Sequence, residues 1–272
     1  MIESNLNNFI LVLPILAKQQ ADLPAFVEKH RWFLDRNGRL LIKSSGEFTG
    51  NVLSDICSDR VMVVVRNDRS IYDAWNQCLE ELNGRGLTEN TYVTFLGIDD
   101  LLSQSYVDLV HTTLQEQPSL DFVYGNSRHE LKGTSYLHES PENPKLFGQN
   151  NFLFDVPHPG MFNRWSTIKN YRFDTQFRLA ADFDFYIGIA LSKSLKWKKL
   201  DTVQATLGGE GISASLNSKQ IYLKEWATIE AKRAVTLSSN KLHTTVTAWI
   251  AKNPLVYKWL RQAWWKIKSM TR

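Results

Sequence analysis

The stretch YVTFLGIDDLL, residues 92–102, gives the clearest indication of the fold. Its first seven residues form an apolar run that predicts a buried β-strand, and two adjacent aspartates, Asp99 and Asp100, follow at once. Neighbouring carboxylates near a core repel each other, and burying them is costly unless a cation or hydrogen bonds compensate their charge. Mg²⁺ and Mn²⁺ prefer such oxygen ligands. From this pair alone two interpretations stay open, a divalent-cation site or a helix cap with a solvated neighbour.

Strands alternate with helices on both sides of this stretch. Short apolar or β-branched runs predict strands at 9–16, 39–45, 60–66, 92–98, 120–126 and 158–165. Apolar residues at helical spacing predict helices at 23–38, 70–84, 103–117 and 179–193. The polar residues 127–157 predict short strands and loops that cover a site. The pattern predicts an α/β fold with a parallel sheet covered on both faces, whose ligands bind at the carboxyl ends of the strands, where Asp99 and Asp100 fall.

The composition is that of a folded protein with no secretory signature. The 272 residues, 43% of them hydrophobic and 22% charged, suit one sizeable α/β domain with an extension. Two cysteines, Cys57 and Cys78, form no metal cluster alone and show no secreted disulfide pattern, which favours a reducing, cytoplasmic compartment. The apolar stretch near the N-terminus is too short to span a bilayer and lacks a basic start, so it predicts the first buried strand.

The charge is divided unevenly along the chain. Residues 1–230 hold 23 basic and 28 acidic residues, a net charge of −5, whereas residues 231–272 hold nine basic residues and no acid. A helix beginning after Asn253-Pro254 would be amphipathic, with tryptophans on both faces and lysines on one. We expect this basic tail to lie on an anionic membrane surface. The alternative is a terminal helix that packs on the domain, and nucleic acid is disfavoured because no recognition motif accompanies the charge.

Three further segments, in a fixed order, resemble one enzyme family. They are NDRSIYDAWNQCLEEL (67–82), HPGMFNRWSTIKNYRFDTQFRLAADFDFYIGIAL (158–191) and LGGEGIS (207–213). Together with YVTFLGIDDLL they resemble the inverting glycosyltransferases of family 2, of the bacterial surface-polysaccharide type, from about residue 60 to residue 213. The resemblance implies a GT-A fold, a mostly parallel nucleotide-binding sheet flanked by helices, to which this chain adds a C-terminal amphipathic helical extension.

The resemblance also implies roles for single residues. The nucleotide-sugar donor, with a UDP-sugar favoured, would be bound by Asp68, Tyr72, Asp73, Asn76, Asp99 and Asp100. Asp100 would hold Mn²⁺ or Mg²⁺ on the donor diphosphate, with Asp99 as its neighbour. Asp182 would be the general base, because the acceptor hydroxyl has a very high pKa and must lose its proton as the bond forms. Alternatively, Asp182 is only an acid favoured by the helix dipole.

On the acceptor side the resemblance places His158, Asp184, Gly209 and Ser213. Asp184 is a second candidate for the base, although one of two aspartates spaced by two residues must turn away from a cleft. His158 would line the acceptor cleft or contact phosphate, or else be structural. The acceptor would be a glycan, carried on a lipid, at the inner face of the cytoplasmic membrane.

The N-terminal third departs from the family pattern. Members usually place an aspartate after the second strand to hold the nucleotide base, but KSSGEFTGN stands here at 43–51, where Ser45 or Glu47 would substitute. We therefore expect residues 1–126 to form the nucleotide-sugar half, 127–230 the acceptor half and 231–272 the tail. The alternative function is a non-catalytic nucleotide-sugar-binding or scaffold protein. A Rossmann-type oxidoreductase is remote, because no G-x-G-x-x-G follows the first strand.

Overall fold

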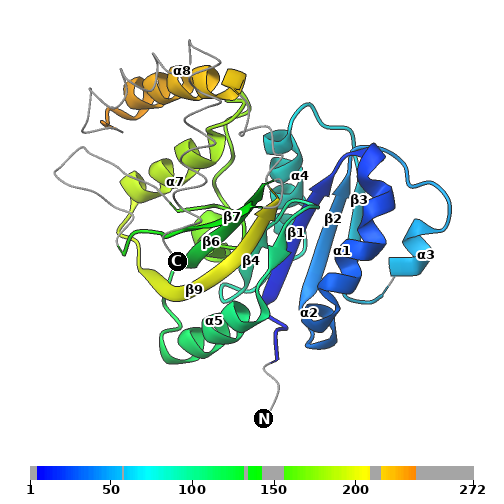
Figure 1. The fold of residues 1–272 in the computed structure, drawn as a ribbon. Coiled ribbons are helices and arrows are strands. Elements are labelled where there is room, and N and C mark those ends of the chain that lie inside the picture. Colours follow the sequence, from blue (N-terminus) through cyan, green and yellow to red (C-terminus); the bar gives the residue numbers. More distant parts are fainter. Residues whose placement is uncertain (1–4, 57, 132–133, 143–155, 209–215, 237–272) are drawn as a thin grey trace.

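A computed structural model describes residues 5–56, 58–131, 134–142, 156–208 and 216–236. The helices are η1 (Ala17–Asp22), α1 (Leu23–Lys29), α2 (Arg31–Asp35), α3 (Val52–Ile56), α4 (Ile71–Gly84), α5 (Gln104–Glu116), α6 (Trp165–Ile168), α7 (Ala181–Ser192) and α8 (Leu216–Arg233). The strands are β1 (Phe9–Ile15), β2 (Arg39–Ser44), β3 (Val61–Val65), β4 (Tyr92–Phe95), β5 (Leu101–Leu102), β6 (Phe122–Leu131), β7 (Thr134–His138), β8 (Phe162–Arg164) and β9 (Trp197–Gly208). Among the described residues the strands form one sheet, in the order β3-β2-β1-β4-β8-β6-β9-β5, with β7 on β6 (Figure 1).

The first four predicted strands are confirmed as a parallel sheet. β2 and β4 flank β1, and β3 pairs with β2, all in parallel register. All residues of β1 and β4 are buried, because both strands lie inside the sheet with helices on each side. Their carboxyl ends therefore point to one edge of the molecule, the edge at which Asp99 and Asp100 follow β4.

The next part of the sheet differs from a simple parallel continuation. The strand expected at 120–126 is present as β6, but β6 does not pair with β4. The short strand β8 lies between them and runs antiparallel to both. β8 is only three residues long, shorter than the expected 158–165, because Pro159 has no backbone N–H and Gly160 has a positive φ of 86°.

Three of the predicted helices are confirmed, as α4, α5 and α7, and one is divided. Ser70 and Ser103 cap α4 and α5, each accepting a backbone N–H in the first turn, so both helices begin where a serine precedes apolar spacing. The helix expected at 23–38 is broken at His30, whose φ and ψ of −109° and 12° are not helical. The His30 ring bonds the Phe26 carbonyl and accepts the Leu102 N–H, which ties the break to β5.

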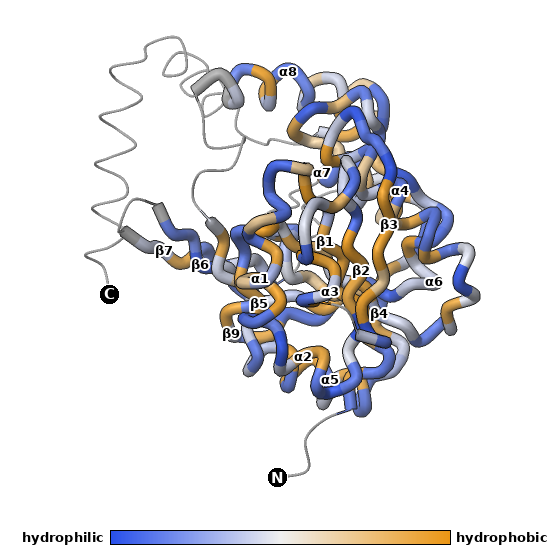
Figure 2. Tube along the Cα trace, turned by 90° about the vertical axis from the view of Figure 1, so that its right-hand side faces the viewer, coloured by the Kyte–Doolittle hydropathy of each residue, from blue (hydrophilic) through white to orange (hydrophobic). Residues whose placement is uncertain are grey.

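Helices cover both faces of the sheet, as the fold class predicted. α4 and α7 contribute buried residues to one core layer, together with alternate residues of β1 such as Ile10 and Val12. α1 and α5 contribute to the opposite layer, with Leu11 and Leu13 of the same strand. Figure 2 shows the apolar residues concentrated on the central strands. The chain is thus a mixed α/β protein with a mostly parallel sheet flanked by helices.

Helix α8 lies along α7, on the side of α7 away from the sheet (Figure 1). It ends at Arg233 and therefore extends past position 230 into the tail expected at 231–272. The expected amphipathic helix after Pro254 falls outside the described residues. Among the described helices, none is both long and apolar enough to cross a bilayer.

Candidate functional site

The turn after β4 holds the Asp100 carboxylate against the end of β9. Asp100 accepts the backbone N–H of Gly97 at 2.8 Å and that of Gly208 at 3.3 Å. Asp99 is exposed and packs beside Gly208, where an added Cβ would lie only 2.8 Å from the Asp99 Cβ. Glycine at 208 therefore allows the close approach that brings the end of β9 to both aspartates.

The surroundings of Asp100 change its pKa and leave part of its carboxylate without a hydrogen-bond donor among the described residues. Burial raises the pKa of Asp100 to about 6, Asp99 adds to the rise, and the N–H groups of Gly97 and Gly208 oppose it. A carboxylate has about four acceptor positions, and the described residues use two of them. Among the described residues no group of three or more His, Cys, Asp or Glu forms a complete metal cluster. Asp99 and Asp100 thus fit a cation that takes its remaining ligands from elsewhere.

Two residues at the start of α4 that were predicted to bind the sugar donor make hydrogen bonds within the fold. The Asp73 carboxylate accepts the Arg69 N–H at 2.9 Å, while the Asp73 N–H donates to Ser70 Oγ. Asn76 bonds the backbone of Phe173 twice, at 2.8 Å each, through its amide N–H and its carbonyl. Asn76 therefore ties α4 to the segment that leads into α7.

Asp68 is paired with a lysine that the sequence pattern did not single out. Lys43, at the end of β2, forms an ion pair with Asp68, and the two side chains are 0% and 8% exposed. Lys43 is the first residue of KSSGEFTGN, the stretch that differs from the family pattern, and its ammonium group is buried. The sequence signal for this pair was a lysine that directly follows the apolar run Leu40–Ile42 of the strand.

The rest of this turn is held by Gln20 of η1, a residue that the sequence pattern also did not single out. The Gln20 amide donates to Ser44 Oγ, to Gly46 O and to Glu47 O, and its carbonyl accepts the Thr49 N–H. The two residues expected to substitute for the base contact have different surroundings. Ser45 Oγ accepts the Ala17 N–H, and Glu47 is exposed.

Asp182 lies half-buried on the first turn of α7 and contacts α4. The Tyr72 hydroxyl donates to Asp182 Oδ1 at 3.4 Å, and the Phe183 N–H donates to the same oxygen at 2.9 Å. Burial raises the pKa of Asp182 to about 6, and Glu225 of α8 adds to the rise, while both hydrogen bonds oppose it. The contact with Tyr72 brings together the predicted donor and acceptor segments.

Asp184 faces the other way, toward α8. Its side chain is 1% exposed, and both of its oxygens accept hydrogen bonds from Arg233 and Lys232 at 2.7–2.8 Å. These two basic residues belong to the nine that the sequence assigns to the tail. The structure therefore separates Asp182 from Asp184, and it pairs the latter with residues that the sequence pattern did not connect to it.

His158 lies in a buried aromatic group near the end of β4. Its ring stacks on Phe95, with centroids 4.9 Å apart, and lies 4.5 Å from the Trp75 ring. Burial lowers the pKa of His158 to about 3, so the ring is neutral. Nδ1 bonds the Tyr186 hydroxyl at 2.8 Å, and Nε2 has no hydrogen-bond partner within the described part of the chain. Gly209 and Ser213 lie outside the described residues.

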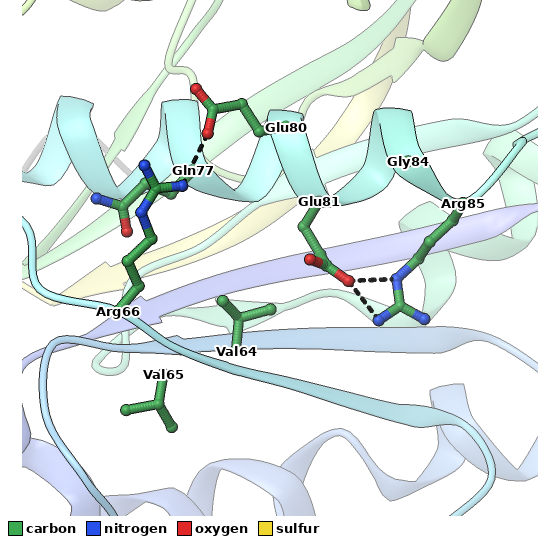
Figure 3. A pocket seen from close by; sticks show the side chains of 8 residues that line it. All are labelled: Val64, Val65, Arg66, Gln77, Glu80, Glu81, Gly84 and Arg85. Carbon is green, nitrogen blue, oxygen red and sulfur yellow. Dashed lines mark hydrogen bonds and ion pairs between the residues drawn. The ribbon is translucent and has the colours of Figure 1, made fainter.

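A continuous series of contacts joins these residues at one edge of the sheet. Tyr72 contacts Asp182, Trp75 of the same helix contacts His158, and His158 stacks on the last residue of β4, just before the Asp99–Asp100 turn. A separate cavity of about 430 Å³ lies between β3 and α4 (Figure 3). It is lined by ion pairs such as Arg66 with Glu80, and none of the predicted site residues lines it.

Comparisons with known proteins place the fold. No protein-family model matches the chain, and no curated protein matches it in sequence. Among solved structures, TarS of S. aureus matches with a TM-score of 0.54 and 13% identity, over 88% of this chain and 42% of that chain. The chain thus spans less than half of that TarS structure. A shorter TarS, 1–349, in complex with UDP, has a TM-score of 0.53 and 14% identity over 83% and 67% of the two chains.

Two further structures are similar. The mannosyltransferase PcManGT from Pyrobaculum calidifontis, in complex with GDP-Man and Mn²⁺, has a TM-score of 0.52 and 12% identity over 90% of this chain and 69% of that chain. Glucosyl-3-phosphoglycerate synthase from Mycobacterium tuberculosis, in complex with Mn²⁺, UDP and phosphoglyceric acid, has a TM-score of 0.51 and 12% identity over 85% and 80%. The shared property at these identities is the fold, which is of the GT-A type.

Proposed function

We propose that the protein is a metal-dependent inverting glycosyltransferase that moves a sugar from a nucleoside-diphosphate sugar to a hydroxyl of a glycan acceptor. The observation that carries the proposal is the contact between Tyr72 at the start of α4 and Asp182 at the start of α7. Trp75 of the same helix contacts Phe95, the last residue of β4, so α4 links Asp182 to the strand that Asp99 and Asp100 follow. Solved structures of similar fold bind UDP or GDP-Man, two of them with Mn²⁺, which supports the same donor class here.

On the donor side, Asp100 and Asp99 would hold Mn²⁺ or Mg²⁺. When bound, the cation offsets the negative charge that develops on the leaving diphosphate. Asp73 and Tyr72, on the first turn of α4, bind the nucleotide, with a UDP-sugar favoured. Asp68 and Asn76 support the site through Lys43 and Phe173, because their side chains are already engaged there.

On the acceptor side, Asp182 is the general base. It takes the proton of the acceptor hydroxyl as that oxygen bonds the anomeric carbon and the bond from this carbon to the diphosphate breaks. Attack from the face opposite the leaving group inverts the configuration. With a pKa of about 6, the carboxylate is ionised at neutral pH and still basic enough to act. Asp184 supports α7 through α8, while His158, Gly209 and Ser213 belong to the acceptor side.

The acceptor we propose is a lipid-linked glycan of a bacterial surface polysaccharide, at the inner face of the cytoplasmic membrane. Of the nine basic residues after position 230, Lys232 and Arg233 pair with Asp184. The other seven, with no acid among them, support a peripheral contact with anionic lipid. In this division residues 1–126 bind the donor, 127–230 the acceptor, and the tail beyond them binds the surface.

A donor screen tests the proposal. The purified protein is heated with UDP-, GDP-, TDP- and CMP-sugars, each with and without Mn²⁺, and its Tm is measured. We expect one class of donor to raise the Tm only with Mn²⁺, because a ligand stabilises the state that binds it. Asp100→Asn should remove the Mn²⁺-dependent part of that rise, while Glu116→Gln, at the exposed end of α5, should keep it. A Tm that no donor changes would contradict the proposal.

A second function is favoured by one observation. The turn at 44–49 is held by Gln20 and lacks the usual aspartate, which fits a non-catalytic nucleotide-sugar-binding or scaffold protein. Such a protein would bind a donor without consuming it. Mn²⁺-dependent hydrolysis of the bound donor in the absence of acceptor would exclude this alternative, and binding without hydrolysis or transfer would support it.

A further inference from the structure

Helix α8 contacts the segment that carries Asp182, although nothing in the sequence pattern connects the two. Trp226 of α8 stacks on Phe183, with ring centroids 5.4 Å apart and an angle of 21° between the rings. Ile229, one turn further on, is fully buried in the core layer that α7 shares. Because Phe183 directly follows Asp182, α8 covers the first turn of α7 from outside.

Glu225 of α8 is bonded to the backbone that enters α7. Its carboxylate accepts the N–H groups of Arg178 at 2.6 Å, Leu179 at 2.9 Å and Ala180 at 2.9 Å. The N–H groups at a helix start have no partner within the helix, and a carboxylate placed there is favoured by hydrogen bonds and by the helix dipole. Glu225 therefore fixes the backbone up to two residues before Asp182.

The C-terminal end of α8 holds the residue two positions after Asp182. Arg233 forms a two-pronged pair with Asp184, and Lys232 bridges Asp184 and Asp174 at 2.8 and 2.7 Å. Gly188 allows this approach, since a Cβ there would lie 2.8–2.9 Å from the Arg233 guanidinium. Asp182 thus lies between two points that α8 holds.

The charged and titratable groups near Asp182 come from three helices. Tyr72 lies on α4 and donates to the carboxylate, Tyr186 lies one turn further along α7, and Glu225 lies on α8. Burial is the main cause that raises the pKa of Asp182, and the negative charge of Glu225 acts in the same direction. Removing that charge while keeping the side-chain length should therefore make Asp182 a weaker base.

We propose that Glu225 is a positioning residue for Asp182, which holds the first turn of α7 so that the Asp182 carboxylate faces Tyr72 and the acceptor hydroxyl. This inference rests on the proposed function, in which Asp182 is the base. It assigns to α8 a role in the reaction that is separate from its packing, because three hydrogen bonds and one charge come from a single side chain.

Two substitutions separate position from charge. Glu225→Asp keeps the charge but is one methylene shorter, so kcat should fall about 10-fold to 100-fold while the acidic limb of the pH–kcat profile stays in place. Glu225→Gln keeps the length but loses the charge, so kcat should fall and the acidic limb should move to lower pH. Lys224→Gln, the neighbouring exposed residue on α8, is the matched control and should leave both unchanged.

The readouts include two that need no turnover. Amide hydrogen exchange at Leu179 and Ala180 should be faster in Glu225→Gln than in Lys224→Gln, and a ¹³C carboxyl titration of Asp182 should move to lower pH. A wild-type kcat and an unmoved Asp182 titration in Glu225→Gln would overturn the positioning role. A wild type that transfers no sugar from any donor contradicts the proposed function instead, while exchange and titration still report whether Glu225 acts on Asp182.

Discussion

Asp182 and Asp184 share the first turn of α7 but face different neighbours. Asp182 contacts Tyr72 and is half-buried, whereas Asp184 is enclosed by Lys232 and Arg233. Two side chains spaced by two residues on a helix point about 200° apart, so one of them must leave the cleft. Here the ion pairs of α8 determine which one leaves, and Asp182 remains as the base that we propose.

The pH dependence of turnover follows from the raised pKa of Asp182. Its carboxyl is protonated below about pH 6 and cannot then accept a proton from the acceptor. With donor and Mn²⁺ saturating, kcat should rise from pH 5 to pH 7 with a midpoint near 6 and then level off. A steady-state profile across pH 5–8 measures this, and a kcat that falls over the same range would contradict the assignment.

Gly208 should be sensitive to a single methyl group. Gly208→Ala places a Cβ 2.8 Å from the Asp99 Cβ, so one of the two segments must move. We expect this movement to lower the free energy of unfolding by about 1–3 kcal/mol. Gly84→Ala, at the end of α4 with nothing within 4 Å of the new Cβ, is the control and should stabilise by up to about 1 kcal/mol. Urea unfolding of both variants measures the difference, and equal stabilities would argue against the close packing at Asp99.

At the scale of single elements, β2 carries the Lys43–Asp68 pair into the core. Lys43→Met should destabilise the protein by roughly 3–5 kcal/mol, because Asp68 would stay buried without its partner. The double variant Lys43→Met with Asp68→Leu should recover much of this loss, since an apolar pair needs no compensation. A double-mutant cycle by urea unfolding measures the coupling, and additive losses would show that the two charges act independently.

The elements that the sequence predicts best have their own local signals. α4 and α5 each start at a capping serine and keep helical spacing, so their bounds agree with the prediction within one residue. β8 has only three residues and depends on its pairing with β4 and β6, which no local pattern encodes. α8 had a usable signal, because Tyr222, Trp226 and Ile229 recur at helical spacing.

The aspartates of the candidate site could be predicted from the sequence, because each stands in a segment with its own pattern. Asp100 and Asp182 stand in recognisable segments, which are linked in the structure by contacts of α4 and His158. Their partners were not predictable, because they come from distant positions. Gly208 reaches Asp100 across 108 residues and Tyr72 reaches Asp182 across 110. Only the folded sheet and the α4–α7 contact bring them together.

In the whole molecule, the start of α4 joins the predicted donor half to the acceptor half. Tyr72 bonds Asp182, Asn76 bonds the backbone of Phe173, and the Tyr72 and Phe173 rings stack with centroids 5.9 Å apart. The two halves therefore meet through several contacts of one helix, which suits a reaction that needs donor and acceptor at a fixed separation.

Membrane binding by the basic tail is a prediction for the whole chain. Deleting residues 253–272 should strongly reduce sedimentation with vesicles that contain phosphatidylglycerol, because it removes basic and aromatic residues together. Binding by the intact chain should also weaken as salt is raised. Neutral phosphatidylcholine vesicles are the control, and unchanged binding of the truncated chain to anionic vesicles would contradict the proposal.

The most direct measurement of the central claim is single-turnover release of nucleoside diphosphate from the donor that the screen identifies, in the presence of Mn²⁺ and a glycan acceptor. We predict release by the wild type, a loss of about 10³-fold or more in Asp182→Asn with donor binding retained, and a product of inverted anomeric configuration by NMR. Asp201→Asn, on β9, is the control and should keep its turnover. Undiminished turnover in Asp182→Asn, or a product of retained configuration, would contradict the account.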